Sequence, residues 1–238
     1  MQRVVISQPM YFPWAGFLSQ LAMADTLIWL DDVQFSKGSF TNRIQIQTPE
    51  GLKWMTVPLQ GRGSGSTISE LRVADANTSA KHRSILQRSF AESDYVSDAL
   101  EVFDLAWSYS SLSEILIASA TLLAEAVGVA PQRTFLSSTM EVAGKGSERV
   151  LGLVKSVGGD TYITAHGGRH YLEHRAFEDA GIEVEYMNYQ IHPWHTPHTH
   201  FVDTVSALDL VANAAPADRL SHLASETRTW RCSGAYPQ

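Results

Sequence analysis

The 238-residue sequence has little cysteine and no excess of positive charge. Its one cysteine, Cys232, excludes an internal disulfide framework and a cysteine-rich zinc site. The 18 Lys and Arg against 25 Asp and Glu give a formal net charge of -7. Because proteins bind nucleic acids largely through basic residues that neutralise phosphates, we expect no broad affinity for DNA or RNA.

Long hydrophobic runs are also missing. The N-terminus passes from Met1-Gln2-Arg3 into a short apolar run, without the hydrophobic region and cleavage site of a signal peptide. The most apolar stretch, residues 115–129, contains Glu125 and is too short to span a bilayer. We therefore expect a cytoplasmic protein that is not inserted in a membrane.

Patterns typical of strands and helices alternate near both ends of the chain. With 44% hydrophobic and 18% charged residues, the composition is that of a globular protein with a sizeable core. Strands are predicted at residues 3–7, 26–30, 134–137, 162–165 and 183–189, and helices at 17–24, 79–107, 111–127, 147–157 and 170–180.

Residues 43–47 and 53–59 alternate polar and apolar side chains around a turn, which predicts a β-hairpin, and residues 68–73 are strand-like. We therefore predict an α/β fold, a mostly parallel sheet with helices on both faces, plus an inserted β-hairpin and a helical segment. No linker or repeat is evident, so residues 1–238 are interpreted as a single domain.

Residues 8–17, Gln-Pro-Met-Tyr-Phe-Pro-Trp-Ala-Gly-Phe, form the most unusual segment. Its prolines stiffen the chain, and it follows a predicted strand, where ligands bind in open α/β sheets. Gln8, Tyr11 and Trp14 therefore predict a binding site for a flat or polar ligand. The alternative is that Tyr11, Phe12 and Trp14 fold back into the core.

A second polar group follows the next predicted strand. It contains the acidic pair Asp31 and Asp32, then Gln34, Asn42 and Arg43. Such side chains can bind a metal, orient an amine or act as a base. Adjacent residues of a strand point to opposite faces, so we expect only one acid to enter the site. The alternative is that one acid caps the loop while the other pairs with Arg43.

The C-terminal third is rich in histidine. His192 follows a predicted strand, and its ordinary pKa suits a general acid or base. His170 and His174 are four residues apart in a predicted helix, and His198 and His200 are two apart in an extended segment. Neither pair has a further ligand at a recognised spacing, so we predict no metal site.

Gly167 and Gly168 lie between a predicted strand and a predicted helix, close to Tyr171. The glycines either expose backbone amides to an anion or serve a tight turn. We include Gly167, Gly168 and Tyr171 among the candidate substrate-binding residues.

Several of these motifs form a common pattern. Its blocks are Gln8-Pro9-x-Tyr11-Phe12-Pro13-Trp14-x-Gly16-Phe17, Asp31-Asp32-Val33-Gln34-Phe35, Asn42-Arg43, Trp54-Met55-Thr56-Val57-Pro58, Gly167-Gly168, Tyr171-Leu172 and His192-Pro193. With these blocks the chain resembles the WbqC-like protein family. The resemblance implies biosynthesis of polysaccharide sugars or natural products, and hence a small polar substrate. The cofactor remains unknown.

We predict a transferase that moves an acyl or aminoacyl group to an amine-bearing small molecule. The substrate would be held by the polar residues of the first two motifs, Asp31 or Asp32 would orient or deprotonate the amine, and His192 would move a proton. The sequence has no serine nucleophile elbow, P-loop or dinucleotide fingerprint, which argues against a serine hydrolase, a P-loop NTPase and a simple NAD enzyme.

Two alternatives stay open. One is a non-catalytic binding or assembly module with a protein partner in a biosynthetic complex, because exposed aromatic residues are enriched at interfaces. The other is a HUP-type nucleotidyltransferase, since the first loop is similar to a phosphate-binding strand–turn–helix, although the usual histidine pair is absent.

Overall fold

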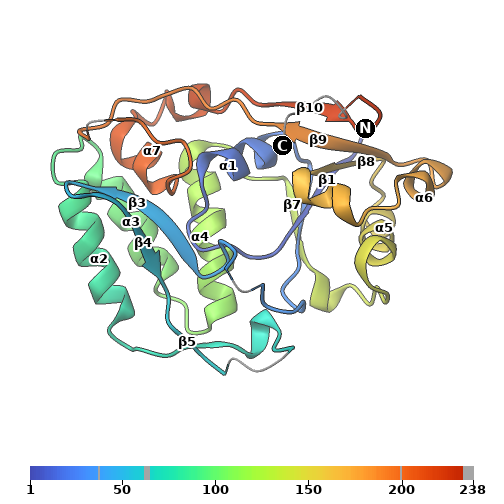
Figure 1. The fold of residues 1–238 in the computed structure, drawn as a ribbon, viewed down its shortest axis with the longest axis horizontal. Coiled ribbons are helices and arrows are strands. Elements are labelled where there is room, and N and C mark those ends of the chain that lie inside the picture. Colours follow the sequence, from blue (N-terminus) through green and yellow to red (C-terminus); the bar gives the residue numbers. More distant parts are fainter. Residues whose placement is uncertain (37, 62–64, 199, 233–238) are drawn as a thin grey trace.

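A six-stranded sheet in the order β10-β9-β8-β1-β2-β7 forms one half of the molecule (Figure 1). The structure is a computed structural model and describes residues 1–36, 38–61, 65–198 and 200–232. The strands are β1 (Arg3–Ser7), β2 (Thr26–Trp29), β7 (Arg133–Leu136), β8 (Thr161–Thr164), β9 (Glu183–Asn188) and β10 (Glu226–Thr229). Neighbouring strands are parallel except for β9 and β10. The predicted, mostly parallel sheet is confirmed, and β10 adds an antiparallel edge strand.

Strand β1 lies in the middle of this sheet. Val4 pairs with Thr26 of β2 on one side and with Tyr162 of β8 on the other. The chain first builds the sheet from β1 through β2 to β7, then returns to add β8 on the opposite side of β1. The carboxyl ends of β1 and β8 therefore form the topological switch point of the sheet, where α/β proteins commonly bind ligands.

Helices cover both faces of the sheet, as predicted. The helices α1 (Ala15–Ala22) and α4 (Leu112–Val127) share a hydrophobic cluster with Val5 of β1. The helix α5 (Gly146–Ser156) and the short α6 (His174–Asp179) contribute to a second cluster, which contains Val4 and Ile6. Because β1 is covered on both faces, successive side chains of the strand are all buried, which explains its run of consecutive apolar residues.

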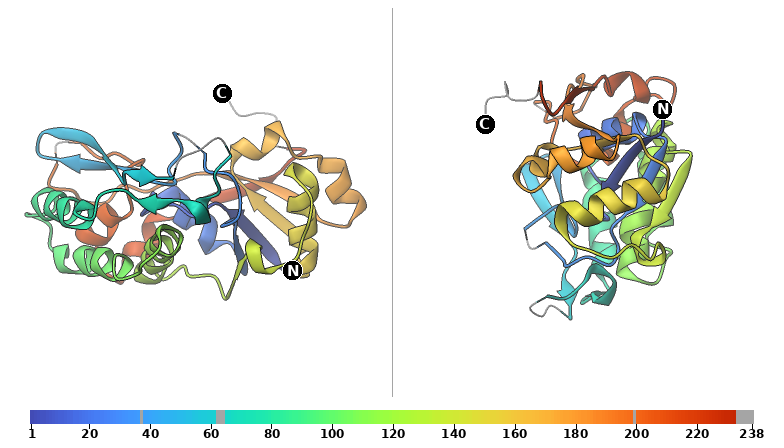
Figure 2. Two further views of the ribbon diagram at one scale, coloured as in Figure 1. Left: turned by 90° about the horizontal axis from the view of Figure 1, so that it is seen from below. Right: turned by 90° about the vertical axis from the view of Figure 1, so that its right-hand side faces the viewer.

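The other half of the molecule contains the hairpin and the remaining helices. The strands β3 (Arg43–Thr48) and β4 (Gly51–Thr56) form the predicted hairpin. The helices of this half are α2 (Thr78–Ser89), α3 (Val96–Ala106) and α7 (Leu208–Asn213). Seen from below, this half and the helices α5 and α6 lie at opposite ends (Figure 2). None of the described helices has the length and apolar character needed to cross a membrane.

The helix predicted at residues 79–107 is wrong, because the structure contains two helices, α2 and α3. Helix α2 ends at Ser89, the fully buried Phe90 caps it, and the amide of Ser93 donates to the Phe90 carbonyl. The amide of Tyr95 donates to the carbonyl of Ala212, at 2.9 Å. The chain turns here because packing against α7 competes with continuing the helix.

Two further predicted elements also differ. Residues 68–73 contain a 3-10 helix (Ile68–Glu70), fixed by a capping box with Thr67, before β6 (Arg72–Val73) pairs with β5 (Leu59–Gln60). The predicted helix at 170–180 is a 3-10 turn (His166–His170) followed by α6. His170 and His174 therefore do not share a helix face. Two more 3-10 turns cover Ser137–Thr139 and Arg219–His222.

Candidate functional site

Parallel strands place several loops at one edge of the sheet. Gln8 follows β1, Asp31 follows β2, Ser137 follows β7 and His166 follows β8. The side chain of Tyr189, just after β9, connects two of these loops: its ring centroid lies 4.9 Å from that of Trp14 and 6.3 Å from that of His166. The first loop and the Gly167-Gly168 loop thus meet at the switch point.

The acidic pair forms a turn beyond the end of β2. One oxygen of Asp31 accepts hydrogen bonds from the Ser138 amide (3.0 Å) and the Ser137 hydroxyl (3.3 Å), and the other accepts from the Ser138 hydroxyl (2.6 Å). The Ser137 hydroxyl also lies 2.6 Å from Asp32. The expectation that the acids point to opposite faces is wrong, because they follow the strand and converge on Ser137.

Asp32 has a charged partner on α5. Its second carboxylate oxygen lies 2.5 Å from Nη2 of Arg149, and the two side chains are 31% and 18% exposed. Partial burial alone raises the pKa of Asp32, but hydrogen bonds from Arg149 and Ser137, together with the Arg149 charge, lower it below its ordinary value. Asp32 is therefore an ionised, partly accessible carboxylate at neutral pH. Its partner is Arg149, not Arg43.

Arg43 and Asn42 make their contacts with residues in or next to the hairpin. The Arg43 guanidinium donates to the Gly38 carbonyl and lies 4.3 Å from the centroid of the Trp54 ring. The buried amide of Asn42 donates to the Val57 carbonyl at 2.8 Å. These contacts indicate that Asn42 fixes the base of the hairpin, whereas the exposed Gln34 forms an isolated β-bridge with Thr67.

Tyr11 lies in the core and not on the surface. Its hydroxyl is 2.8 Å from Nδ1 of His82 and accepts a hydrogen bond from Nε1 of Trp107 at 3.0 Å. Burial lowers the pKa of His82 to about 4, against the opposing effect of a hydrogen bond with the Thr56 backbone, so the imidazole stays neutral. We therefore leave Tyr11 out of the proposed binding surface.

Phe12 explains why the first loop points inward. Its φ of 40° is unusual for an aromatic residue and needs support from its surroundings. The Phe12 amide donates to the Ser119 hydroxyl (3.0 Å), and the Ser206 hydroxyl donates to the Phe12 carbonyl (2.8 Å). Trp14 alone among the three aromatics stays half-buried, with its ring over Gly16, where a Cβ would come within 2.2 Å of the indole.

The turn after β8 contains both glycines. Gly168 is buried, and a Cβ there would lie 3.0 Å from Leu172 and Thr164, so close packing favours glycine. Gly167 is exposed. Partial burial raises the pKa of Tyr171, which is about half exposed. Partial burial and the charge of Arg169 lower the pKa of the exposed His166, so this imidazole is neutral at neutral pH.

His192 lies on the loop after β9 and is exposed. Its backbone amide donates to the carbonyl of His222, and Nδ1 of His222 lies 3.0 Å from the His192 carbonyl. Within the described residues, no hydrogen bond joins the His192 ring to the acidic turn.

Sequence reasoning missed Ser137, Ser138, Arg149, His166 and Tyr189. Ser137 and Tyr189 are the last residues of predicted strands, and Ser138 and His166 come directly after predicted strands. The rule that pointed to Asp31 therefore directs attention to all four positions. Arg149 has no such signal, because it is 117 residues from Asp32 along the chain.

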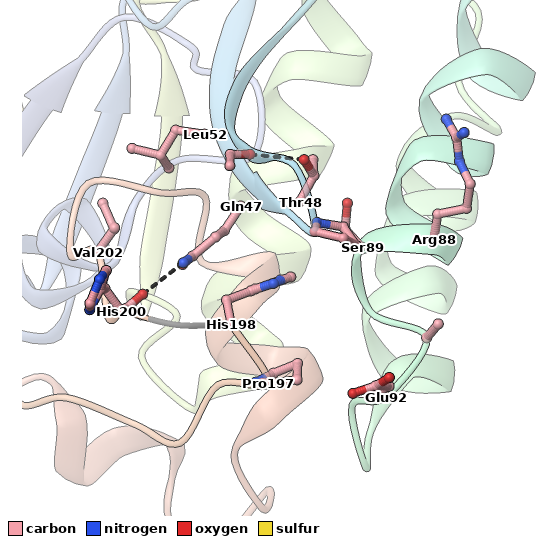
Figure 3. Close-up of a pocket in the computed structure, with 13 residues that line it drawn as sticks. Gln47, Thr48, Leu52, Arg88, Ser89, Glu92, Pro197, His198, His200 and Val202 are labelled. Atoms are coloured by element: carbon pink, nitrogen blue, oxygen red, sulfur yellow. Dashed lines mark hydrogen bonds between the residues drawn. The ribbon is translucent and has the colours of Figure 1, made fainter.

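A cleft of about 650 Å³ lies elsewhere, between the hairpin turn, the end of α2, and Pro197, His198, His200 and Val202 (Figure 3). Within the described part of the chain, no three His, Cys, Asp or Glu side chains are placed to hold a metal ion.

Together these features define an α/β protein with polar side chains in the loops at the carboxyl edge of a mostly parallel sheet. The chain belongs to the WbqC-like protein family, which it matches over residues 8–220. It is 27% identical over 218 residues to the uncharacterized protein Rv1507c of Mycobacterium tuberculosis, covering 90% of this chain and 94% of that protein. No solved structure gives a significant match.

Proposed function

We propose that the protein is an enzyme of small-metabolite biosynthesis that transfers an acyl or aminoacyl group to an amine-bearing substrate. The observation that carries the proposal is the ionised and partly exposed carboxylate of Asp32, fixed by Arg149 and Ser137 at the carboxyl edge of the sheet. A fixed carboxylate at such an edge attracts and orients an ammonium or amine group.

The neighbouring residues then take different roles. Asp31 positions the turn, because both its oxygens accept hydrogen bonds from Ser137 and Ser138. Trp14 and Tyr189 supply a partly exposed aromatic pair for a flat substrate face. Gln8, whose amide lies 3.4 Å from the Ser36 hydroxyl, offers a polar contact at the end of β1.

Proton transfer is assigned to His166 in place of His192. The imidazole of His166 is neutral at neutral pH and follows β8 at the switch point. In the proposed step, the amine nitrogen attacks the acyl carbon of the donor and the bond to the leaving group breaks. His166 accepts the proton lost by the amine and passes it to the leaving group.

The test combines a substrate search with matched variants. The protein is incubated with amino sugars and other primary amines, together with acyl thioesters and aminoacyl adenylates, and products are identified by mass spectrometry. On the substrate pair found, Asp32→Asn and His166→Gln should lose most turnover, whereas His192→Gln should retain it. Full turnover in a folded Asp32→Asn variant would overturn the proposal.

A second candidate function is a non-catalytic assembly module. The favouring observation is the aromatic face of the hairpin, defined by Phe40, Leu52 and Trp54, whose side chains are 41%, 48% and 46% exposed. Exposed apolar groups of this kind are typical of interfaces. Co-purification with a protein partner that is lost in Trp54→Ala, combined with absence of turnover for all substrate pairs, would favour this function.

A further inference from the structure

One edge of the hairpin is hydrogen-bonded to a distant part of the chain, and the other edge is largely uncovered. On the β3 side, the amide of Ser206 donates to the carbonyl of Gln45 at 2.9 Å. On the β4 side, His82 of α2 makes a hydrogen bond with the backbone of Thr56, the last residue of the strand. Of residues 51–55, which make up the rest of β4, four are exposed. The uncovered edge is therefore this part of β4.

Alternate residues of β4 direct their backbone groups to this edge. The amide of Val57 donates to the Asn42 carbonyl, which therefore faces β4, whereas the Gln45 carbonyl faces away from it. Gln45 thus belongs to a pair without mutual hydrogen bonds, and its partner Trp54 directs its N–H and C=O outward. Leu52, two positions earlier, does the same. Within the described residues, no hydrogen bond reaches the outward groups of Leu52 and Trp54.

Apolar side chains accompany these backbone groups. Leu52 and Trp54 are two residues apart in a strand, so their side chains share one face, and they are 48% and 46% exposed. The exposed ring of Phe40 lies beside them, with its centroid 5.9 Å from that of Trp54. An uncovered strand edge is a template for pairing with another chain, and exposed apolar side chains beside it add surface that association buries.

Charged side chains, lysine above all, normally protect such an edge from pairing. Lys53 has this position in β4, but its Nζ atom lies 2.6 Å from a carboxylate oxygen of Glu50. Each of the two side chains is more than half exposed, and together they carry no net charge. A second molecule that approaches this edge therefore meets no uncompensated charge on the strand.

We propose that this edge pairs with the same edge of a second copy of the chain, antiparallel and related by a two-fold axis beside Lys53. Leu52 then lies opposite the partner's Trp54, and Trp54 lies opposite the partner's Leu52, so that the outward backbone groups of both residues are hydrogen-bonded. The two Lys53 side chains face each other, each neutralised by its own Glu50. A second copy fits because its strand is already extended and presents the same alternation of hydrogen-bonding groups. The dimer does not depend on the proposed transfer at the sheet edge.

Sedimentation velocity of the full chain over a range of concentrations tests the proposal. Because the contact is small, we expect a weak monomer–dimer equilibrium, with a dissociation constant between about 1 µM and 1 mM. Leu52→Pro removes an outward N–H and no hydrogen bond of the hairpin, and it should weaken the dimer by about tenfold or more. Leu52→Ala keeps this N–H and should weaken the dimer less. Trp54→Ala should also weaken it, whereas Lys81→Gln, exposed on α2, should leave it unchanged.

A cross-link checks which residues face each other. Residues directly opposite in an antiparallel pair without mutual hydrogen bonds have Cα atoms about 4.5 Å apart, a separation that a disulfide can bridge. In a Cys232→Ser background, Lys53→Cys should therefore form a covalent dimer under mild oxidation. Lys81→Cys in the same background is the matched control and should stay monomeric.

Three results would each overturn the proposal. The first is a chain that is monomeric at about 1 mM. The second is a dimer that neither Leu52→Pro nor Trp54→Ala weakens, because its interface would then lie elsewhere. The third is a Lys53→Cys variant that cross-links no better than Lys81→Cys. Circular dichroism shows that each variant is folded, and unfolding measured well below the dissociation constant reports the monomer alone.

Discussion

Two hydrogen-bonded networks hold loops around the sheet edge, and they differ in their access to solvent. The Tyr11 network, defined by Tyr11, His82 and Trp107, joins the first loop to α2 and the end of α3, and Tyr11 is fully buried. The acidic-turn network, defined by Asp31, Asp32, Ser137, Ser138 and Arg149, leaves Asp32 and Arg149 partly exposed. The aromatic motif therefore stabilises the fold, and the acidic motif provides accessible charge.

The Tyr11 network should dominate the response to mild acid. His82 stays neutral in the folded state down to about pH 4, whereas in the unfolded chain it binds a proton near pH 6.5. The unfolded state therefore binds more protons in this window, and folding stability falls as pH is lowered through it, by on the order of 3 kcal/mol.

Urea unfolding at pH 7 and pH 4 measures this effect. In His82→Gln, the loss of stability between the two pH values should be smaller than in the wild type by most of that amount. An equal loss in both proteins would show that His82 is not the responsible group. The lowered pKa of Asp32 acts in a different window, because its stabilising contribution is lost only as pH falls below its unfolded value, near 3.8.

Removing the hydroxyl oxygen of Tyr11 should have the next largest effect on stability. Tyr11→Phe keeps the ring but leaves Nδ1 of His82 and Nε1 of Trp107 without their partner, and we expect a loss of about 2 kcal/mol in the free energy of unfolding. Tyr109→Phe is the matched control, because Tyr109 is about half exposed. It should change stability by less than about 0.5 kcal/mol. Equal effects of the two substitutions would show that the network adds no stability.

Within the acidic turn, the two aspartates should separate stability from function. Asp31→Asn places an amide group among three hydrogen-bond donors and should lower stability by about 1–2 kcal/mol. Asp32→Asn removes a partly exposed ion pair and should lower it by less than about 1 kcal/mol. Turnover should show the reverse order. Denaturant unfolding and the product assay, made on the same preparations, check both.

The smallest effect is expected at the aromatic face of the hairpin. Trp54→Ala should change the free energy of unfolding by less than about 1 kcal/mol, because nearly half of the side chain is already exposed. Thermal unfolding of the isolated protein checks this. A larger loss would mean that the stacking of Arg43 on Trp54 supports the hairpin.

The sequence predicts the central strands well because their apolar runs are local signals. The elements that it misplaces depend on distant partners. The break between α2 and α3 needs Ala212 to receive the Tyr95 amide. In strand β10, charged residues alternate with threonines, so no apolar pattern marks the segment as a strand. It forms a strand because it pairs with β9. Neither partner can be read from the segment itself.

The candidate site is predictable to a similar degree. Strand ends correctly indicate where the loops after β1, β2 and β8 gather. Sequence proximity suggested Arg43 as the partner of an aspartate, but helix α5 brings Arg149 to Asp32. The aromatic loop was ambiguous between site and core, because its direction depends on Ser119 and Ser206, both far away in the sequence.

The central position of β1 has a consequence for the order of folding during synthesis. One edge of β1 pairs with β2 within the first 29 residues, but the other edge has no partner until residues 161–164 have left the ribosome. The Phe12 carbonyl gains its hydrogen-bond donor still later, because Ser206 lies 194 residues further along the chain. Such distant pairings slow folding and leave strand edges open to other chains. The nascent protein is therefore most vulnerable to aggregation at the strand that later lies deepest in its sheet.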